Sequence, residues 1–405
     1  MNATERLYYT DSHLTEFEAH VTTVAAMDDG RTAVTLDRTA FYPTGGGQPD
    51  DTGYLNEARV VECIDLDESE VWHVIEGRAP EVGARIAGRV DWPRRFDHIQ
   101  QHTGQHILSQ AFVELFKAET RGFRMMERVS EIDVALDQPS DARVAEAVWL
   151  ANRIVWSNKT VRVHQNVAPE EIARMNLRKE PQREGLLRVI EIEGFDMNAC
   201  GGTHAQRTGE VGLIAVRSWE RAKGMTRVEF VAGGRALTDY NEANQTARSV
   251  AALFSVGRDE AFASATRQSQ ENKQLARRIA ELEEVKAHVE AEALRDEAVS
   301  RADGVRLIAR VVETQSVEHL KRLARALIAD GHTIALLGSP DKEAARLVFA
   351  RSSEPGDDMN ALMREACAAI NGRGGGRADF AQGGGSGTAN LADTLDSLAR
   401  RLLHN

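Results

Sequence analysis

The feature that most constrains the fold is a pair of Cys/His motifs in distant parts of the chain. His102 and His106 are four residues apart in a segment with helical periodicity, so their imidazoles share one helix face. Cys200 and His204 enclose Gly-Gly-Thr, which can turn tightly enough for a thiolate and an imidazole to converge. Three imidazoles and one thiolate suit Zn²⁺ in tetrahedral geometry. The pattern therefore predicts one zinc ion, held by a fold that brings the two motifs together.

A second interpretation of the same residues stays open. Cys200 would be a nucleophile and His204 its general base, which also requires an oriented base and an oxyanion hole. If all four side chains bind zinc, the site is closed, as in structural zinc sites, so catalytic and structural roles for the ion both stay open. His98 lies one turn before His102 and is expected to be a hydrogen-bond donor to a ligand or a surface group.

Composition excludes few functions but indicates a compartment. The 405-residue chain carries a formal charge of −12, which argues against a general polycation but allows a local basic groove. Its three cysteines are widely spaced and odd in number, so we expect no disulfide framework, and we expect Cys63 and Cys367 in the core. No signal peptide is visible, and no apolar run approaches the roughly 18 residues of a membrane span. A soluble, cytoplasmic protein is expected.

The first two parts of the chain read as a barrel followed by a mixed domain. Residues 1–92 are mostly short runs rich in β-branched residues, separated by turn segments, as is typical of a small β-barrel. Trp92-Pro93 is expected to close this part, and Asp97 to cap the helix that carries the histidine pair. Residues 93–245 mix strands and helices, which predicts an α+β fold.

The last two parts read as a charged helix and an α/β domain. Residues 246–302 contain a highly charged run with apolar residues at heptad-like positions, so a linker or dimerising helix is predicted. Residues 303–405 alternate strands and helices and end in an amphipathic helix. The apolar heptad-like positions are Leu275, Ile279, Leu282 and Val289. The whole chain is thus expected to be an α+β multidomain protein.

The motifs together resemble a known family. HTGQH at 102–106, DMNACGGTH at 196–204 and TGEVG at 208–212 resemble the editing domain of alanyl-tRNA synthetases and of the free-standing alanyl-tRNA editing proteins, the AlaX type in its long form. LDRTAFYPTGGGQPDDTG at 36–53 resembles the glycine-rich motif of the barrel before that domain. NGRGGGRADFAQGGG at 371–385 resembles the signature of the DHH-associated C-terminal domain. The resemblance covers nearly the whole chain in the family's order.

The resemblance implies a role for each part of the chain. Residues 1–92 would be the small β-barrel, 93–245 the zinc-containing editing (tRNA deacylase) domain, 246–302 the helical linker, and 303–405 the α/β DHH-associated domain, which binds tRNA. The implied reaction is zinc-dependent, ATP-independent hydrolysis of the ester of mischarged Ser-tRNA(Ala), with Gly-tRNA(Ala) as a further substrate. The implied partners are tRNA for alanine and a second copy of the chain, which would form a homodimer through the C-terminal domain and the charged helix.

Editing overcomes a physical limit on recognition. Serine differs from alanine by one hydroxyl group, and a small apolar pocket cannot strongly reject such an analogue. A second, polar pocket can hydrogen-bond that hydroxyl and would leave its own polar groups unpaired with alanine. The correct ester would then escape hydrolysis.

The candidate site residues come from the same motifs. Thr103 and Thr203 stand between the ligand positions and would bring hydroxyl groups near the ion. Asp196 is a candidate hydrogen-bond partner for a ligand imidazole. The glycine-rich loop would cover the acceptor end of the tRNA, and its candidate substrate-binding residues are Thr44, Gly46, Gly47 and Gln48. For the tRNA backbone the candidates are Arg373, Gly375, Gly376 and Arg377.

Several alternatives stay open. Arg124 stands where family members often carry a histidine and Thr44 where Glu or Gln is common, and both positions bear on substrate preference. Editing of threonyl-tRNA is the nearest enzymatic alternative, although its second motif usually has Gly-Pro-His after the cysteine. A non-catalytic, zinc-stabilised tRNA-binding protein is an alternative of another class. A DHH-type phosphoesterase would need an Asp-His-His run, and the nearest string here is FDHIQQH.

Overall fold

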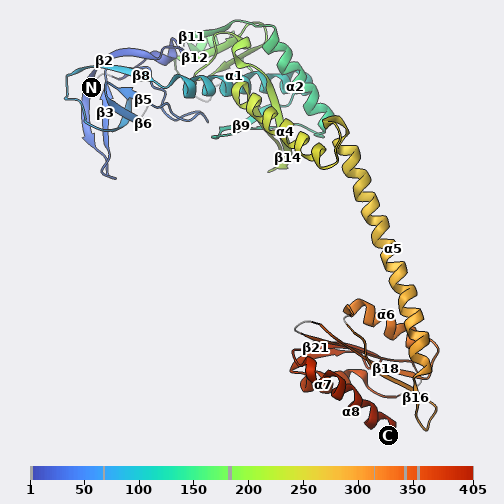
Figure 1. The fold of residues 1–405 in the computed structure, drawn as a ribbon. Coiled ribbons are helices and arrows are strands. Elements are labelled where there is room, and N and C mark those ends of the chain that lie inside the picture. Colours follow the sequence, from blue (N-terminus) through green and yellow to red (C-terminus); the bar gives the residue numbers. More distant parts are fainter. Residues whose placement is uncertain are drawn as a thin grey trace. The chain divides into compact units, whose positions relative to one another are not determined.

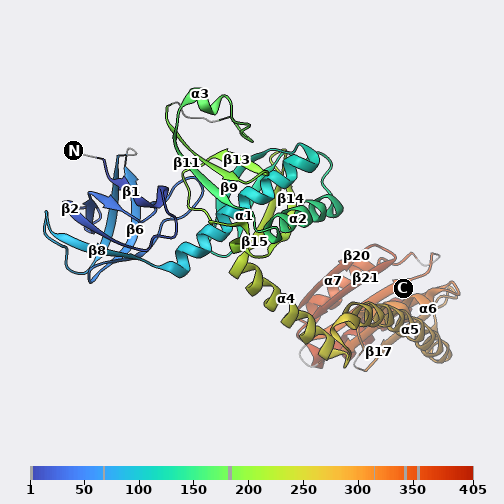
Figure 2. The ribbon, with the colours of Figure 1, turned by 90° about the horizontal axis from the view of Figure 1, so that it is seen from above.

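The computed structural model describes residues 3–66, 69–180, 185–313, 315–341, 344–353 and 356–404 (Figures 1 and 2). The chain forms two compact units, Met1–Ser249 and Val250–Asn405. Both mix helices and strands, which confirms the predicted α+β, multidomain character. Among the described residues, no helix combines the length and the apolar character that crossing a membrane requires.

The first unit begins with a closed barrel of six strands, in the order β2-β3-β7-β6-β5-β8. Alternation of side chains along β2 and β8 turns Phe17, Ala19, Ile86 and Val90 into the barrel core. The barrel strands are β2 (Glu16–Ala26), β3 (Thr32–Leu36), β5 (Gly53–Leu55), β6 (Ala58–Leu66), β7 (Glu70–Glu76) and β8 (Arg85–Val90). The short strands β1 (Glu5–Arg6) and β4 (Arg38–Thr39) pair in parallel, and the 3-10 helix η1 (Leu7–Tyr9) lies between them in sequence.

The rest of the first unit packs two sheets and helices around α1 (Trp92–Phe116). One sheet has the order β14-β15-β10-β9 and the other β11-β12-β13. Their strands are β9 (Thr120–Met125), β10 (Ser130–Val134), β11 (Val161–Val167), β12 (Leu187–Ile192), β13 (Asp196–Ala199), β14 (Ile214–Ala222) and β15 (Met225–Ala232). The helices are α2 (Asp141–Trp156), α3 (Pro169–Ile172), η2 (Thr208–Val211) and α4 (Gly233–Leu253). Apolar side chains of α1, including Ile107 and Phe112, are fully buried in this core.

The start of α1 corrects the expectation that Asp97 caps this helix. The helix begins at Trp92, with Asp91 as the capping residue and Pro93 in the first turn. Proline is tolerated there because the first backbone N–H groups of a helix have no partner within the helix. The Asp97 carboxylate instead forms an ion pair of 2.6 Å with Arg235. The Trp-Pro pair therefore opens the helix, directly after the last barrel strand has ended at Val90.

The second unit is built on a six-stranded mixed sheet of order β16-β17-β18-β19-β21-β20. Only β17 and β18 among its described pairs run in parallel, joined through α6, and the remaining pairs are antiparallel. The strands are β16 (Val299–Ser300), β17 (Arg306–Val311), β18 (Thr333–Pro340), β19 (Ala345–Arg351), β20 (Gly372–Gly376) and β21 (Phe380–Gly385). The helices are η3 (Arg258–Glu260), α5 (Ala261–Asp296), α6 (Val317–Ile328), α7 (Met359–Ala369), η4 (Thr388–Asn390) and α8 (Leu391–His404).

Helices cover both faces of this sheet. Apolar residues of α7 and α8 form one core with the sheet, and those of α6 and the end of α5 form another (Figure 1). The amphipathic terminal helix is thus confirmed as α8. Most residues in the first two thirds of α5 are exposed, among them the heptad-like Leu275, Ile279 and Leu282, and Val289 further along is exposed as well. Cys63 and Cys367 are buried, as predicted.

Candidate metal centre

Helix α1 presents one half of the Cys/His cluster. His102 and His106 lie one turn apart, with their ring centroids 5.4 Å from each other, and both are almost completely buried. The helix is anchored on both sides of the pair, because Ile99 and Ile107 are fully buried in the core of the first unit. The two imidazoles are therefore held on a rigid element.

The loop after β13 presents the other half. Cys200 follows the strand directly, and its Sγ lies 3.3 Å from His102 Nε2 and 3.3 Å from His204 Nε2. A Cβ on Gly202 would come within 2.2 Å of His102 Cε1, so only glycine allows this approach of loop to helix. The structure thus brings together all four residues of the predicted set, with one donor atom of each within 4.8 Å of the others.

Each imidazole in the cluster has a protein partner for its outer nitrogen. His102 Nδ1 lies 2.7 Å from Gln48 Oε1, and His106 Nδ1 lies 3.1 Å from Asp196 Oδ2. His204 Nδ1 lies 3.4 Å from Thr103 Oγ1. A histidine that binds a metal through one ring nitrogen commonly donates the other N–H to such a partner, which sets its tautomer and orientation. The Nε2 atoms of His102 and His204 are thus left facing Cys200.

The electrostatics of the cluster suit a metal ligand set. Burial alone would raise the pKa of the Cys200 thiol, but His102 and His204 hold that pKa well below its usual range. Burial holds the pKa of His204 well below its ordinary value. A thiolate and neutral imidazoles are the forms that bind metal ions. The Sγ–Nε2 distances of 3.3 Å are also close to the donor–donor edge of about 3.6 Å expected for tetrahedral zinc. The residues present fit a zinc ion.

A cavity of about 780 Å³ opens above the cluster. His102, His106 and Cys200 reach it from one side, together with Gly201 and Gly202 of the loop. Aromatic and basic side chains form other parts of its wall, among them Tyr9, Tyr42, Arg6, Arg121 and Arg188. The cluster therefore faces a space large enough for a small ligand or the end of a larger one.

Some candidate residues of the glycine-rich loop line this cavity, and others are buried beside it. Thr44 and Gly46 lie on the cavity wall, and Thr44 is exposed. Gly47 has a positive φ of 82°, and a Cβ there would come within 2.5 Å of the Phe123 carbonyl oxygen. Gln48 is buried and bonded to the protein, like Thr103 and Thr203. Among these candidates for substrate contact, Thr44 and Gly46 thus face open space.

Asp196, the expected hydrogen-bond partner of a ligand imidazole, lies beside His106 of the cluster. Its Oδ2 contacts His106 and its Oδ1 lies 3.5 Å from Arg178 Nε. Arg178 also donates to the backbone carbonyl of His106 with a distance of 2.9 Å. The Asp196 carboxylate raises the pKa of His106 against the effect of burial. The carboxylate is therefore part of the support of the cluster.

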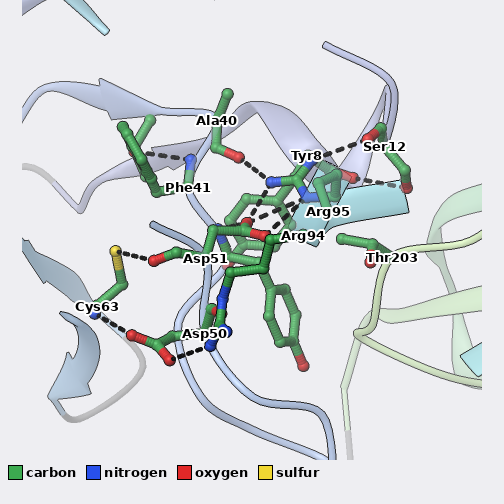
Figure 3. A network of polar contacts seen from close by, with 12 residues as sticks. Tyr8, Ser12, Ala40, Phe41, Asp50, Asp51, Cys63, Arg94, Arg95 and Thr203 are labelled. Atoms are coloured by element: carbon green, nitrogen blue, oxygen red, sulfur yellow. Dashed lines mark hydrogen bonds and ion pairs between the residues drawn. The ribbon is translucent and has the colours of Figure 1, made fainter. Parts of the chain in front are cut away.

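Two consecutive arginines of α1 tie the glycine-rich loop to the helix that carries His102 (Figure 3). Arg94 donates to the Asp50 backbone carbonyl at 2.8 Å. Arg95 is fully buried, forms an ion pair with Asp51, and donates to the carbonyl oxygens of Ser12 and Ala40 at 2.8 and 2.5 Å. The loop is thereby held at a defined position relative to the cluster.

Some functional candidates were missed by sequence reasoning. Arg188 donates to the carbonyl oxygens of Cys200 and Gly202 at 2.8 and 2.9 Å, and its guanidinium lies 5.3 Å from the centre of the Tyr9 ring. Nothing in the strand pattern around Arg188 distinguishes it from an ordinary exposed residue of a sheet. Tyr9 lies in a segment that carries no motif, and Tyr42 lies inside the glycine-rich motif at 36–53, where no pattern marks its ring for a role.

The structure also gives the surroundings of His98 and Arg124. His98 is buried, so the expectation of a surface group is wrong, and burial lowers the pKa of His98 to about 3. Among the described residues, its Nδ1 has no hydrogen-bond partner. Arg124 lies on β9 and forms an ion pair of 2.6 Å with Glu131.

The candidates for the tRNA backbone lie in the second unit, on the β20–β21 hairpin. Arg373 and Arg377 are exposed, and Arg377 forms an ion pair of 3.2 Å with Asp379. Gly376 N donates to Asn360 Oδ1 at 3.0 Å. The four residues, Arg373, Gly375, Gly376 and Arg377, therefore lie along the edge strand β20 and in the turn that follows it.

Family models match three segments of the chain. A model of the class II (A) tRNA synthetases matches residues 1–94. A model of the second additional domain of threonyl and alanyl tRNA synthetases matches residues 187–229, which include Cys200 and His204. A model of the DHHA1 domain matches residues 304–404. The matches follow one another along the chain.

Curated relatives extend these matches. The alanyl-tRNA editing protein AlaX-L of Pyrococcus horikoshii is 36% identical over 249 residues, which are 59% of this chain and 60% of that protein. Alanine–tRNA ligases of Archaeoglobus fulgidus and Pyrobaculum neutrophilum are 30% and 34% identical over 99% of this chain and 44% of each ligase. The chain thus spans about half the length of the curated relatives it matches. Its sequence is thus similar to an alanyl-tRNA editing protein and to the corresponding regions of alanine–tRNA ligases.

Proposed function

We propose that this protein is an editing deacylase that hydrolyses the ester of serine mischarged onto tRNA for alanine, with the glycyl ester as a further substrate. The observation that carries the proposal is a buried cluster of three histidines and one cysteine at the side of a cavity of about 780 Å³. The name of the Pyrococcus relative, an alanyl-tRNA editing protein, supports the same reaction. Hydrolysis adds water to the ester carbonyl, breaks the bond to the ribose oxygen, and releases serine and tRNA.

The proposed cofactor is one zinc ion held by His102, His106, Cys200 and His204. The ion would supply a Lewis acid that polarises the ester carbonyl. Asp196 and Thr103 support the ligands from outside the cluster, through contacts with His106 and His204.

The wall of the cavity suits the single-stranded end of a tRNA. Unpaired bases stack on aromatic rings, and phosphates bind arginine and lysine side chains. Tyr9 and Tyr42 offer rings, and Arg6 and Arg121 offer positive charge around the same cavity. We propose that these residues bind the acceptor end, and that Thr44 and Gly46 of the glycine-rich loop lie over it.

The proposal extends to the rest of the chain. The exposed arginines and backbone N–H groups of the β20–β21 hairpin suit a phosphate backbone, so Arg373, Gly375, Gly376 and Arg377 would bind the tRNA. The exposed apolar residues of α5 would pair two copies of the chain. The proposed domain limits are those derived from the sequence, with the deacylase domain at 93–245, and the proposed compartment is the cytoplasm.

The experiment that tests this function compares two substrates. Purified protein is mixed with seryl-tRNA and with alanyl-tRNA, both on tRNA for alanine, and the loss of labelled amino acid is followed. Rapid loss of serine with alanine retained is expected. If both esters stay intact while the protein binds tRNA and zinc, the protein is a non-catalytic tRNA-binding module. Seryl-tRNA for threonine is assayed in parallel, and loss of serine from that tRNA alone would instead favour the threonyl type of editing.

A further inference from the structure

Gln48 is the one residue of the glycine-rich loop whose side chain enters the metal cluster from the barrel side. Gly45 and Gln48 exchange two backbone hydrogen bonds, of 3.0 and 2.9 Å, which close a tight turn. Gly46 and Gly47, between them, both have positive φ angles, of 56° and 82°. This turn directs the Gln48 side chain inward, where it is 1% exposed.

The Gln48 carboxamide spans the two halves of the cluster. Its Oε1 lies 2.7 Å from His102 Nδ1 on α1, and it accepts from the Thr203 backbone N–H at 3.2 Å. Its Nε2 donates to Thr203 Oγ1 at 2.9 Å. Thr203 is the residue directly before His204, so one side chain contacts both the helix and the loop that carry the ligands.

These contacts determine the tautomer of His102. The Thr203 backbone N–H can only donate, so the atom of Gln48 that faces it must be the oxygen. That oxygen is an acceptor, and it therefore requires a hydrogen on His102 Nδ1. The neutral ring then has its lone pair on Nε2, which is the atom facing Cys200 Sγ.

The residues around Gln48 and His102 leave little room for the Gln48 side chain to take another position. A Cβ on Gly202 would come within 2.5 Å of His102 Nδ1 and 3.1 Å of Gln48 Oε1, so the loop backbone closes this contact from above. Asp50 and Asp51, which follow Gln48 closely, are held by Arg94 and Arg95 of the helix that bears His102 (Figure 3). The glycine-rich loop is thus bonded at two places to α1, the helix that carries His102.

We propose that Gln48 is a positioning residue through which the barrel completes the metal centre. It holds His102 in the tautomer that presents Nε2 to the ion, and it holds the Cys200–His204 loop against the helix. The inference rests on the proposed metal binding by the four cluster residues. In this inference Gln48 contacts the cluster residues, whereas Thr44 and Gly46 of the same loop contact the substrate.

The test measures metal affinity in the full chain, not activity. Co²⁺ is titrated into metal-free protein in competition with a chelator, and its visible absorption bands report the ligand field. Gln48→Leu removes the acceptor and is expected to weaken Co²⁺ binding about 10- to 100-fold and to change the absorption bands. Gln48→Glu retains an oxygen acceptor for His102 and Thr203 and is expected to restore affinity to within about threefold of wild type.

Gln101→Leu is the matched control. Gln101 is also a fully buried glutamine. Among the described residues, its side chain bonds to the Ala232 backbone, twice at 2.9 Å, and to Asp97. Its loss should lower the unfolding midpoint and leave the Co²⁺ affinity and bands of the folded protein unchanged. Wild-type affinity in Gln48→Leu, or failure of Gln48→Glu to rescue it in a folded protein, would overturn the inference. If wild-type protein binds no metal, it is the proposed function that fails.

Discussion

Cys200 Sγ lies 3.3 Å from His102 Nε2, although 98 positions separate the two residues in the sequence. The contact joins the loop after β13 to the middle of α1, and both elements are buried in the same core. Arg188, Gln48 and Asp196 support it from three directions, by bonds to the loop backbone, to His102 and to His106. The cluster is thus a built site, because its polar groups are held by further polar groups in the interior.

Removal of the thiolate should remove most of the bound metal. Cys200→Ala leaves three imidazoles and is expected to lose most of its zinc and all measurable deacylation. Metal content per chain, measured by elemental analysis after dialysis, checks this result. Cys367→Ala is the matched control, because Cys367 is buried in the second unit and packs against Met363. It should retain one zinc per chain, and a fully active, zinc-free Cys200→Ala protein would refute zinc as the cofactor.

The close approach of Gly202 to His102 should matter for metal affinity as much as one of the four cluster residues does. Gly202→Ala would place a Cβ within 2.2 Å of His102 Cε1, so the ring or the loop must move and metal affinity should fall by at least about tenfold. Gly201→Ala is the control, because the nearest atom to its Cβ, Tyr9 Oη, is 3.5 Å away. Equal metal affinities for the two variants would show that the cluster tolerates displacement.

The buried ion pair below the glycine-rich loop should dominate the stability of the first unit. Arg95→Met leaves the Asp51 carboxylate buried without its partner and is expected to cost about 3–5 kcal/mol in the free energy of unfolding. Arg85→Met breaks the exposed pair with Glu18 and should cost far less, because solvent screens an exposed ion pair. Urea unfolding followed by tryptophan fluorescence gives both values. A similar loss of unfolding free energy in the two variants would show that the buried Arg95–Asp51 pair contributes no more than the exposed pair.

The barrel should lose stability in mild acid through His73. Burial lowers the pKa of His73 to about 4, below its ordinary value of about 6.5. The unfolded chain then binds more protons between these pH values, so stability is present above about pH 6.5 and falls as the pH drops towards about 4. His73→Gln has no titrating ring and should reduce this decline by roughly 3 kcal/mol. If wild type and His73→Gln lose stability in parallel as the pH falls, His73 does not cause the decline.

The sequence predicts the four residues that cluster and Asp196 beside them, but not that Gln48 supports them. His102 and His106 can be paired from helical spacing alone, and the Cys200 loop from its glycines and its chemistry. Gln48 was expected to face a substrate, whereas its side chain contacts His102 and Thr203. Such a contact depends on how a turn directs one side chain from the barrel to α1, and local pattern carries no information about that.

The start of α1 shows the same limit at the level of secondary structure. Proline usually ends an element, and Asp97 has the chemistry of a cap, so the pattern favoured a later helix start. In the fold, Pro93 occupies the first turn and Asp97 pairs with Arg235 from a segment far along the chain. Tertiary partners of this kind decide between local signals that are equally acceptable.

The most direct test of the account is reconstitution of activity with zinc. Metal-free protein is titrated with Zn²⁺, and hydrolysis of Ser-tRNA(Ala) is measured at each step beside Ala-tRNA(Ala) and a far-UV spectrum of the protein. The account predicts that seryl ester hydrolysis rises with bound zinc and reaches its plateau at one ion per chain, while the alanyl ester stays intact. Full hydrolysis by a folded, metal-free protein, or none at any zinc level, would contradict it.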